Sequence, residues 1–251
     1  MAYAKIIDID DPGYFRLKSI DQSQLKQFLK NPADWAYHRL NDDHKPTDAM
    51  KFGTAFHAYL LGTSDVVSLP EGESFRSKDN QKWRDEQLEA GNIIVSYNDM
   101  QLLKRMKEGI EQTSLMPEYP DYMEIIEQGT KEQCIEWKDR QTGLMLKAKP
   151  DLIPVGTDYL VDLKTAQKAD AESFAKEVIN YGYHIQTVFY RAAVAACKPD
   201  AFDRGSKAPS TMQFWVFEKS GACDWQPFSY CVLNRNVIST SFQAEALLSI
   251  K

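Results

Sequence analysis

The chain of 251 residues is long enough to form one sizeable core, and its 43% hydrophobic and 26% charged residues are typical of a globular protein. The net charge of −6 argues against indiscriminate binding to nucleic acid. The acidity is concentrated in residues 1–130, which carry 15 basic and 22 acidic side chains, whereas residues 131–191 carry nine of each. An acidic exterior around a locally basic groove would satisfy both observations.

The sequence also bears on where the protein works. It has no apolar run of the roughly 18 residues that a membrane-spanning helix needs, and its first residues lack the basic-then-apolar pattern of a secretory signal. The cysteines are widely spaced and form no CxxC pair, which favours reduced thiols over a metal framework. We therefore expect a cytoplasmic protein without a membrane span. The cysteines are Cys134, Cys197, Cys223 and Cys231.

The N-terminal half is predicted to be mainly helical. Asp21 can cap a helix that ends at Pro32, and a second helix begins directly afterwards. From Met50 onward apolar residues recur at helical spacing, and His57 lies on that helix. The other predictions for this half are loops over 41–50 and 62–80, helices over 80–90 and 98–112, and a strand over 93–95.

The C-terminal half is predicted to alternate between strands and helices. A turn over 166–170 leads into a helix that breaks near Gly182, and a second helix with an apolar stripe follows. The chain has no internal repeat and no long linker, so one α/β domain is expected. Strands are predicted over 122–128, 133–138, 211–219 and 228–233, with a turn over 139–143, a loop over 198–210 and a final helix.

Two alternating stretches, 144–151 and 159–165, predict a pair of strands joined by a turn at 154–158. Residues two apart share a face of a strand, so Asp162 and Lys164 point the same way. A matching polar row is expected on the other strand at Lys147, Lys149 and Asp151. Two carboxylates and a lysine are the grouping that metal-dependent phosphodiester cleavage needs. The pattern is short, however, and spacing alone equally allows ordinary turn and surface residues.

Three motifs resemble the PD-(D/E)XK nuclease superfamily, and more closely the RecE-like nuclease domain of bacterial exodeoxyribonuclease VIII and its phage relatives. They are Lys149-Pro-Asp151, Val161-Asp-Leu-Lys-Thr165 and the Gln-x-x-x-Tyr pair within residues 183–190. The segment from Phe52 to His57 resembles the upstream histidine motif of that family. The resemblance covers roughly residues 19–235 and is strongest over 131–195.

The resemblance implies a restriction-endonuclease-like α/β core with a central mixed sheet flanked by helices. It implies a single nuclease domain over 1–251, with an N-terminal helical part at about 1–115 and a catalytic core at about 116–235. The implied metal ligands are His57, Asp151, Asp162 and the carbonyl of Leu163. The remaining implied site residues are Lys164 as the catalytic lysine, Glu132 as an acidic site residue, and Gln186 and Tyr190 lining the DNA groove or bracing the site.

The implied activity is that of a Mg²⁺-dependent exodeoxyribonuclease, with Mn²⁺ able to substitute. It would degrade linear double-stranded DNA from its ends, in the 5′→3′ direction, during homologous recombination. The implied partners are double-stranded DNA ends, a RecT-like single-strand annealing protein, and further copies of the chain in a ring such as a trimer or tetramer. A ring would reconcile the acidic total with DNA binding, because basic residues could line its channel.

Several alternatives stay open at this point. A histidine on an apolar helix face is more often a core residue than a ligand, and Glu136 could be confused with Glu132. Arg76, Lys78 and Arg84 could bind phosphate, although a solvated loop and a charged helix are the better explanation for any single one of them. The fold could also serve an endonuclease, a helicase-associated nuclease, or a DNA-binding protein without catalysis.

Overall fold

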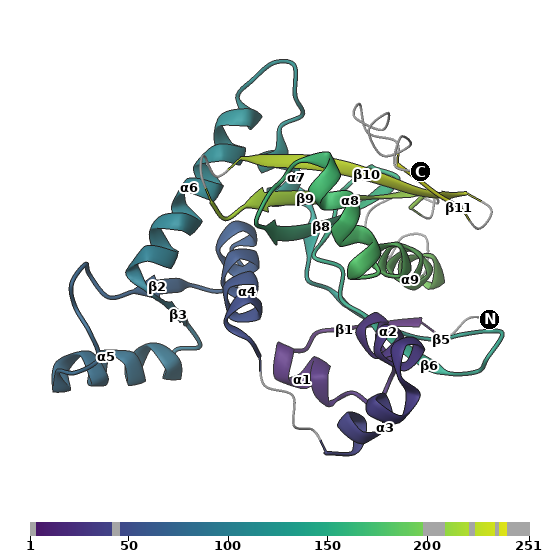
Figure 1. The fold of residues 1–251 in the computed structure, drawn as a ribbon, viewed down its shortest axis with the longest axis horizontal. Helices are drawn as coiled ribbons and strands as arrows, with labels where there is room; N and C mark the ends of the chain where they lie inside the picture. Colours follow the sequence, from purple (N-terminus) through teal and green to yellow (C-terminus); the bar gives the residue numbers. More distant parts are fainter. Residues whose placement is uncertain (1–3, 42–45, 198–208, 221–223, 234–235, 240–251) are drawn as a thin grey trace.

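The computed structural model describes residues 4–41, 46–197, 209–220, 224–233 and 236–239 (Figure 1). The helices are α1 Asp11–Arg16, α2 Gln22–Lys30, α3 Pro32–Asn41, α4 Asp48–Leu61, α5 Lys78–Glu89, α6 Tyr97–Ser114, α7 Tyr122–Gln128, α8 Ala171–Asn180 and α9 Tyr183–Ala196. The strands are β1 Ala4–Ile7, β2 Val66–Ser68, β3 Ile93–Val95, β4 Thr130–Lys131, β5 Cys134–Lys138, β6 Met145–Ala148, β7 Leu152–Ile153, β8 Tyr159–Ala166, β9 Thr211–Glu218, β10 Trp225–Leu233 and β11 Asn236–Ser239.

A six-stranded mixed sheet organises the described chain, in the order β11-β10-β9-β8-β7-β4. β8 and β9 are parallel, and α8 and α9 form the crossover between them. The other neighbours in this sheet are antiparallel. Helices cover both faces of the sheet, which confirms the predicted α/β core with a central mixed sheet flanked by helices.

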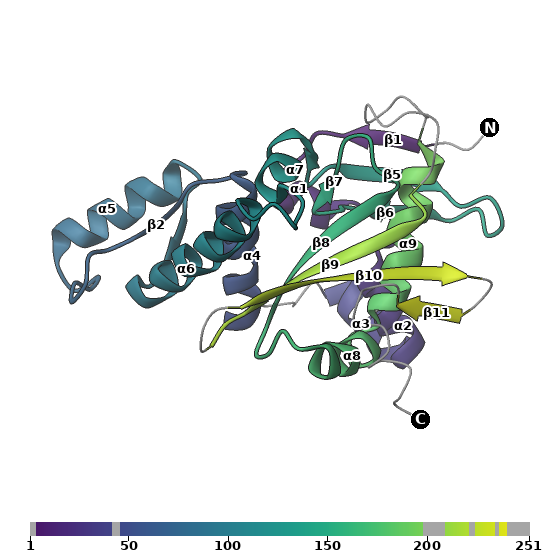
Figure 2. The same cartoon turned by 90° about the horizontal axis from the view of Figure 1, so that it is seen from above.

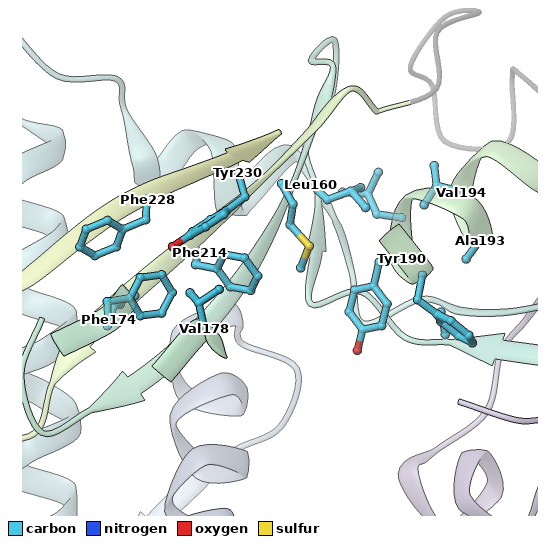
Figure 3. Close-up of a cluster of buried hydrophobic side chains, with 14 of the residues drawn as sticks. Leu160, Phe174, Val178, Tyr190, Ala193, Val194, Phe214, Phe228 and Tyr230 are labelled. Carbon is cyan, nitrogen blue, oxygen red and sulfur yellow. The ribbon is translucent and has the colours of Figure 1, made fainter. Parts of the chain in front are cut away.

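The two faces of β8 pack into different cores, because side chains alternate across a strand. Leu160 joins a cluster with α8, α9 and the inner strands, in which the Phe174 and Phe228 rings stack at 4.7 Å (Figure 3). Val161 and Leu163 join the second cluster, with α4, α6 and α7. β8 is therefore held from both sides, and Asp162 and Lys164 project from its α9 side.

A smaller antiparallel sheet, in the order β1-β5-β6, packs against the other side of α9. Lys147 on β6 is fully buried there. Its ammonium donates hydrogen bonds to the carbonyls of Tyr14 (2.9 Å) and Leu17 (3.1 Å), and it lies 3.8 Å from Asp21 Oδ2. Burial lowers the pKa of Lys147, and the charge of Asp21 opposes that effect. This buried cation fastens α1 and the start of α2 to β6.

A third, two-stranded parallel sheet pairs β2 with β3, and α5 connects them. In both cartoon views α5 lies at one end of the molecule, apart from β8 and α9 (Figures 1 and 2). The sequence predicted β3, but it predicted a loop where β2 forms. Among the described residues, none of the helices is long and apolar enough to cross a membrane.

Two further predictions, for residues 122–128 and 144–151, are wrong. Residues 122–128 form a helix, because Asp121 caps it by accepting from Glu124 N, and Tyr122 and Ile126, four apart, bury one helical face. The chain from 144 to 151 does not form one strand paired with β8. Its first part is β6, which pairs with β5, and only β7 reaches β8. Lys147 therefore faces α1 and α2 and shares no polar row with Asp151.

Other predictions agree with the structure or lie beyond its description. The predicted helices that correspond to α2 to α6, α8 and α9 are confirmed, as are the strands corresponding to β5, β9 and β10. The final helix lies outside the described residues, as does most of the predicted loop over 198–210. Cys134 and Cys197 carry free thiols, and the side chains of Cys223 and Cys231 lie outside the described part.

The buried Lys147 gives a stability prediction. Lys147→Met should lower the free energy of unfolding by about 3 kcal/mol, because it removes the cation while leaving two carbonyls and Asp21 buried without their donor. Urea unfolding followed by circular dichroism measures the change. Lys138→Met, at an exposed position on β5, is the matched control and should change stability by less than about 0.5 kcal/mol. Equal effects of the two substitutions would contradict the fastening role.

Candidate active site

The site is built on an edge of β8 that strand pairing leaves incomplete. β7 is two residues long and pairs with β8 at Leu152 and Val161. Pro150 precedes this point and has no N–H to continue the ladder. Side chains take over instead: Asp151 Oδ2 accepts from Leu163 N at 2.7 Å, and His57 Nε2 lies 3.0 Å from Leu163 O. The Leu163 N–H is thereby satisfied by Asp151, and the Leu163 carbonyl lies beside His57.

The Asp162 side chain projects from the face of β8 that packs against α9, opposite the side chains of Val161 and Leu163, and it is 1% exposed. Its Oδ1 accepts a short hydrogen bond from Gln186 Nε2 on α9. Its Oδ2 forms an ion pair with the ammonium of Lys164, although it accepts no hydrogen bond of normal geometry from any described residue. This buried oxygen therefore has a cation beside it but no directed hydrogen-bond donor, and such a group calls for an explanation.

Lys164 reaches the surface while remaining paired with Asp162. Its side chain is 18% exposed, and its ammonium lies over the ring of Tyr183 at 4.7 Å and that of Phe214 at 5.8 Å. Aromatic faces attract a cation and limit its movement. The ammonium is thus held at the mouth of the site, where it can meet an incoming anion.

The pKa of Asp151 is shifted by burial and by the neighbouring charges. Burial raises the pKa of Asp151 to about 6, and the neighbouring charge of Asp162 adds to the rise. His57, Lys164 and the Leu163 N–H oppose it, and His57 Nδ1 lies 3.6 Å from Asp151 Oδ1. The opposing groups therefore do not restore the usual pKa of the buried Asp151 carboxyl.

A backbone hydrogen bond joins Glu132 to Asp151. Glu132 N donates to Asp151 O at 2.9 Å, and the Glu132 carboxylate lies 3.7 Å from Lys149 Nζ, which also binds Asp11. Glu132 has a φ of +46°, in the left-handed region that non-glycine residues rarely occupy. Glu136, by contrast, pairs with Lys5 at 3.1 Å and accepts from Ser19, so the two glutamates are clearly distinct.

The family resemblance implies a divalent metal, and the donor set is of the kind such an ion needs. Carboxylate and carbonyl oxygens suit Mg²⁺ and Mn²⁺. His57 Nε2 and Leu163 O lie 3.0 Å apart, at the same point on the edge of β8. Among the described residues, however, His, Cys, Asp and Glu side chains do not gather in a group of three that could hold an ion. Asp162 is turned toward Lys164 and Gln186, so binding would require a small reorientation.

Gln186 and Tyr190 are both buried on the inner face of α9 (Figure 3 shows Tyr190). Gln186 donates to Asp162 and shares a side-chain hydrogen bond with Tyr190. Burial raises the pKa of Tyr190 well above its usual value, so its hydroxyl stays protonated. These positions favour bracing of Asp162 over direct contact with DNA.

The basic side chains predicted to bind phosphate do not lie next to Asp151, Asp162 and Lys164. Arg76 and Lys78 are exposed at the start of α5, and Arg84 pairs with Asp85 at 2.7 Å on that helix. The α5 region lies at the far end of the molecule from α9 in both cartoon views (Figures 1 and 2). Binding of phosphate by Arg76 or Lys78 stays a prediction.

Sequence reasoning missed two residues that surround Lys164. Tyr183 precedes Gln186 by almost one helical turn, so its position on the same face of α9 could have indicated a contact near Asp162. Lys26 on α2 is close enough to Lys164 for the two charges to interact. No local pattern indicated this, because the contact joins residues 138 positions apart.

The chain was compared with known proteins. Residues 21–224 match the family described as "PDDEXK-like domain of unknown function (DUF3799)". No curated protein matches the sequence. Among solved structures, the fold is similar to that of a "putative exonuclease" from Eubacterium rectale, with a TM-score of 0.54 and 15% identity, covering 96% of this chain and 82% of that one. At this identity the likeness concerns the fold.

The donor set gives a prediction about metal binding. Mn²⁺ at a hundred times its Kd should stabilise the chain by about 2.7 kcal/mol, seen as a rise in Tm. Asp162→Asn should remove this rise, because it deletes the charge of the central carboxylate. Asp48→Asn, on the exposed first turn of α4, should keep it. A full Mn²⁺-dependent rise in the Asp162→Asn variant would contradict the assignment.

Proposed function

We propose that this chain, which belongs to the family of PDDEXK-like domains and has the fold of the PD-(D/E)XK nuclease superfamily, hydrolyses phosphodiester bonds of DNA. The observation that carries the proposal is the buried grouping of Asp151, Asp162 and Lys164 at the incomplete edge of β8. Two desolvated carboxylates next to a partly exposed ammonium are costly to maintain for stability alone.

The proposed chemistry assigns each side chain a separate task. Asp151, Asp162 and Leu163 O, with His57, would hold a divalent cation such as Mg²⁺ or Mn²⁺. Such a cation, when bound, lowers the pKa of a water and offsets negative charge on the phosphate. Lys164 orients the attacking water and offsets the charge that develops on the phosphate oxygens. Gln186 fixes the carboxylate of Asp162, because it binds one of its two oxygens.

The finer proposal is a Mg²⁺-dependent exonuclease that degrades linear duplex DNA in the 5′→3′ direction. Its support is the resemblance of the three sequence motifs to the RecE-like branch, together with the fold shared with a protein described as a "putative exonuclease". Participation in recombination, a RecT-like annealing partner and a ring of identical chains rest on the same resemblance.

The role of Lys164 can be separated from that of the carboxylates. Lys164→Met should lower the rate of Mg²⁺-dependent cleavage by about 10²–10³-fold, as expected for loss of one group that stabilises developing charge. The same variant should keep the Mn²⁺-dependent rise in Tm, because it retains the proposed ligands. Lys168→Met, at an exposed position after β8, should cleave at the normal rate. Unchanged cleavage by Lys164→Met would exclude its catalytic role.

Action from ends is tested with paired substrates. With Mg²⁺, the chain should degrade a linear plasmid and leave the covalently closed circle intact, because an exonuclease needs an end. On duplexes labelled at one end, the 5′ label should be released before the 3′ label. Cleavage of the closed circle would identify an endonuclease, and early loss of the 3′ label would reverse the polarity. No hydrolysis with either Mg²⁺ or Mn²⁺ would refute the nuclease proposal.

A further inference from the structure

A groove lies between α2 and the turn that joins α8 to α9, and Lys164 and Gln186 form part of its lining. Its volume is about 1050 Å³. This is at the upper end of the range for small-ligand pockets, so it has room for a few nucleotides of one strand. The groove gives the buried site an approach from solvent.

The groove is basic although the N-terminal half of the chain is acidic. Lys26 and Lys30, four residues apart on α2, line it together with Lys164. Asp34 is the only carboxylate among the described lining residues. This carboxylate accepts from Gln27 Nε2 at 3.2 Å and lies 3.4 Å from His38 Nε2.

Lys26 spans the groove and lacks a neutralising partner within hydrogen-bond distance among the described residues. Its ammonium donates to the carbonyl of Tyr181 at 2.9 Å, which leaves further N–H donors available. Burial and the nearby charge of Lys164 lower the pKa of Lys26 to about 8. A phosphate placed between these two lysines would relieve their repulsion and accept hydrogen bonds from both.

The opposite wall offers an aromatic surface. Tyr181 is 59% exposed and stacks on Tyr183 with ring centroids 5.7 Å apart. Tyr183 in turn stacks on Phe214 at 5.3 Å and carries the ammonium of Lys164 over its ring. An exposed ring backed by this stack provides a rigid surface for a base, and base stacking on aromatic side chains is typical of single-strand binding.

We propose that this groove binds a single strand of DNA, with Lys26 and Lys30 contacting its phosphates and Tyr181 stacking on a base. The strand then presents a phosphodiester to Lys164, which lines the groove and pairs with the buried Asp162. The inference deepens the proposed function, since it names the form in which DNA enters the same site.

The test measures binding without cleavage. A fluorescent 12-nucleotide single strand is titrated with the full chain in EDTA, and anisotropy is recorded at several salt concentrations. Lys26→Ala/Lys30→Ala should weaken binding by about tenfold or more and reduce the salt slope by about 1.4, since each single-strand phosphate contact contributes about 0.7. Tyr181→Ala should weaken binding at least fivefold, and Tyr181→Phe should restore it, because stacking needs only the ring.

The control for charge is Lys82→Ala/Lys104→Ala, which removes two exposed lysines from α5 and α6 and should leave affinity within about twofold. Thermal melts establish that each variant is folded. Equal weakening by the two double variants, or tighter binding of a blunt duplex of the same length than of the single strand, overturns the proposal. Groove-dependent binding by a chain that never cleaves DNA refutes the nuclease function alone. If the chain cleaves DNA but its affinity for the single strand does not depend on Lys26, Lys30 and Tyr181, the groove proposal alone is refuted.

Discussion

The incomplete edge of β8 is the constraint on which the described site depends. Before β7 begins, the N–H and carbonyl of Leu163 would be left without strand partners, and leaving buried backbone groups unpaired is costly. Asp151 binds the N–H and His57 approaches the carbonyl, so a structural requirement draws two of the implied ligands to one backbone position. Pro150 contributes to this arrangement, because it has no N–H with which to extend the β7–β8 ladder opposite Leu163.

Helices on the two faces of the sheet contribute the other side chains that surround this edge. α4 brings His57 from the side of Val161 and Leu163, whereas α9 brings Gln186 and Tyr183 from the side of Asp162. The parallel β8–β9 pair fixes the strand between them, since its crossover is made of α8 and α9. On the outer side, buried Lys147 anchors α1 and the N-cap of α2, which sets the position of the wall that carries Lys26.

Much of this arrangement was predictable, and the failures have physical causes. The alternation of β8 placed Asp162 and Lys164 on one face, which the structure confirms, because strand periodicity is a local property. The predicted pairing of 144–151 with 159–165 is wrong, since alternation cannot show which strand is the partner. Lys147 lies on β6, which pairs with β5 in the smaller sheet. Residues 122–128 also alternate weakly, but the cap at Asp121 and the burial of Tyr122 and Ile126 made them helical. The approach of Lys26 to Lys164 depends on tertiary structure alone.

The proposed cation site at this edge consists of Asp151, Asp162 and the Leu163 carbonyl. A crystal grown with Mn²⁺ and measured near the manganese absorption edge tests this site most directly. We expect an anomalous peak within bonding distance, about 2.1–2.3 Å, of Asp162 and Leu163 O, with Asp162 turned away from Lys164. An anomalous map without a peak at β8, with Lys164 still paired to Asp162 in fully Mn²⁺-loaded protein, would contradict it.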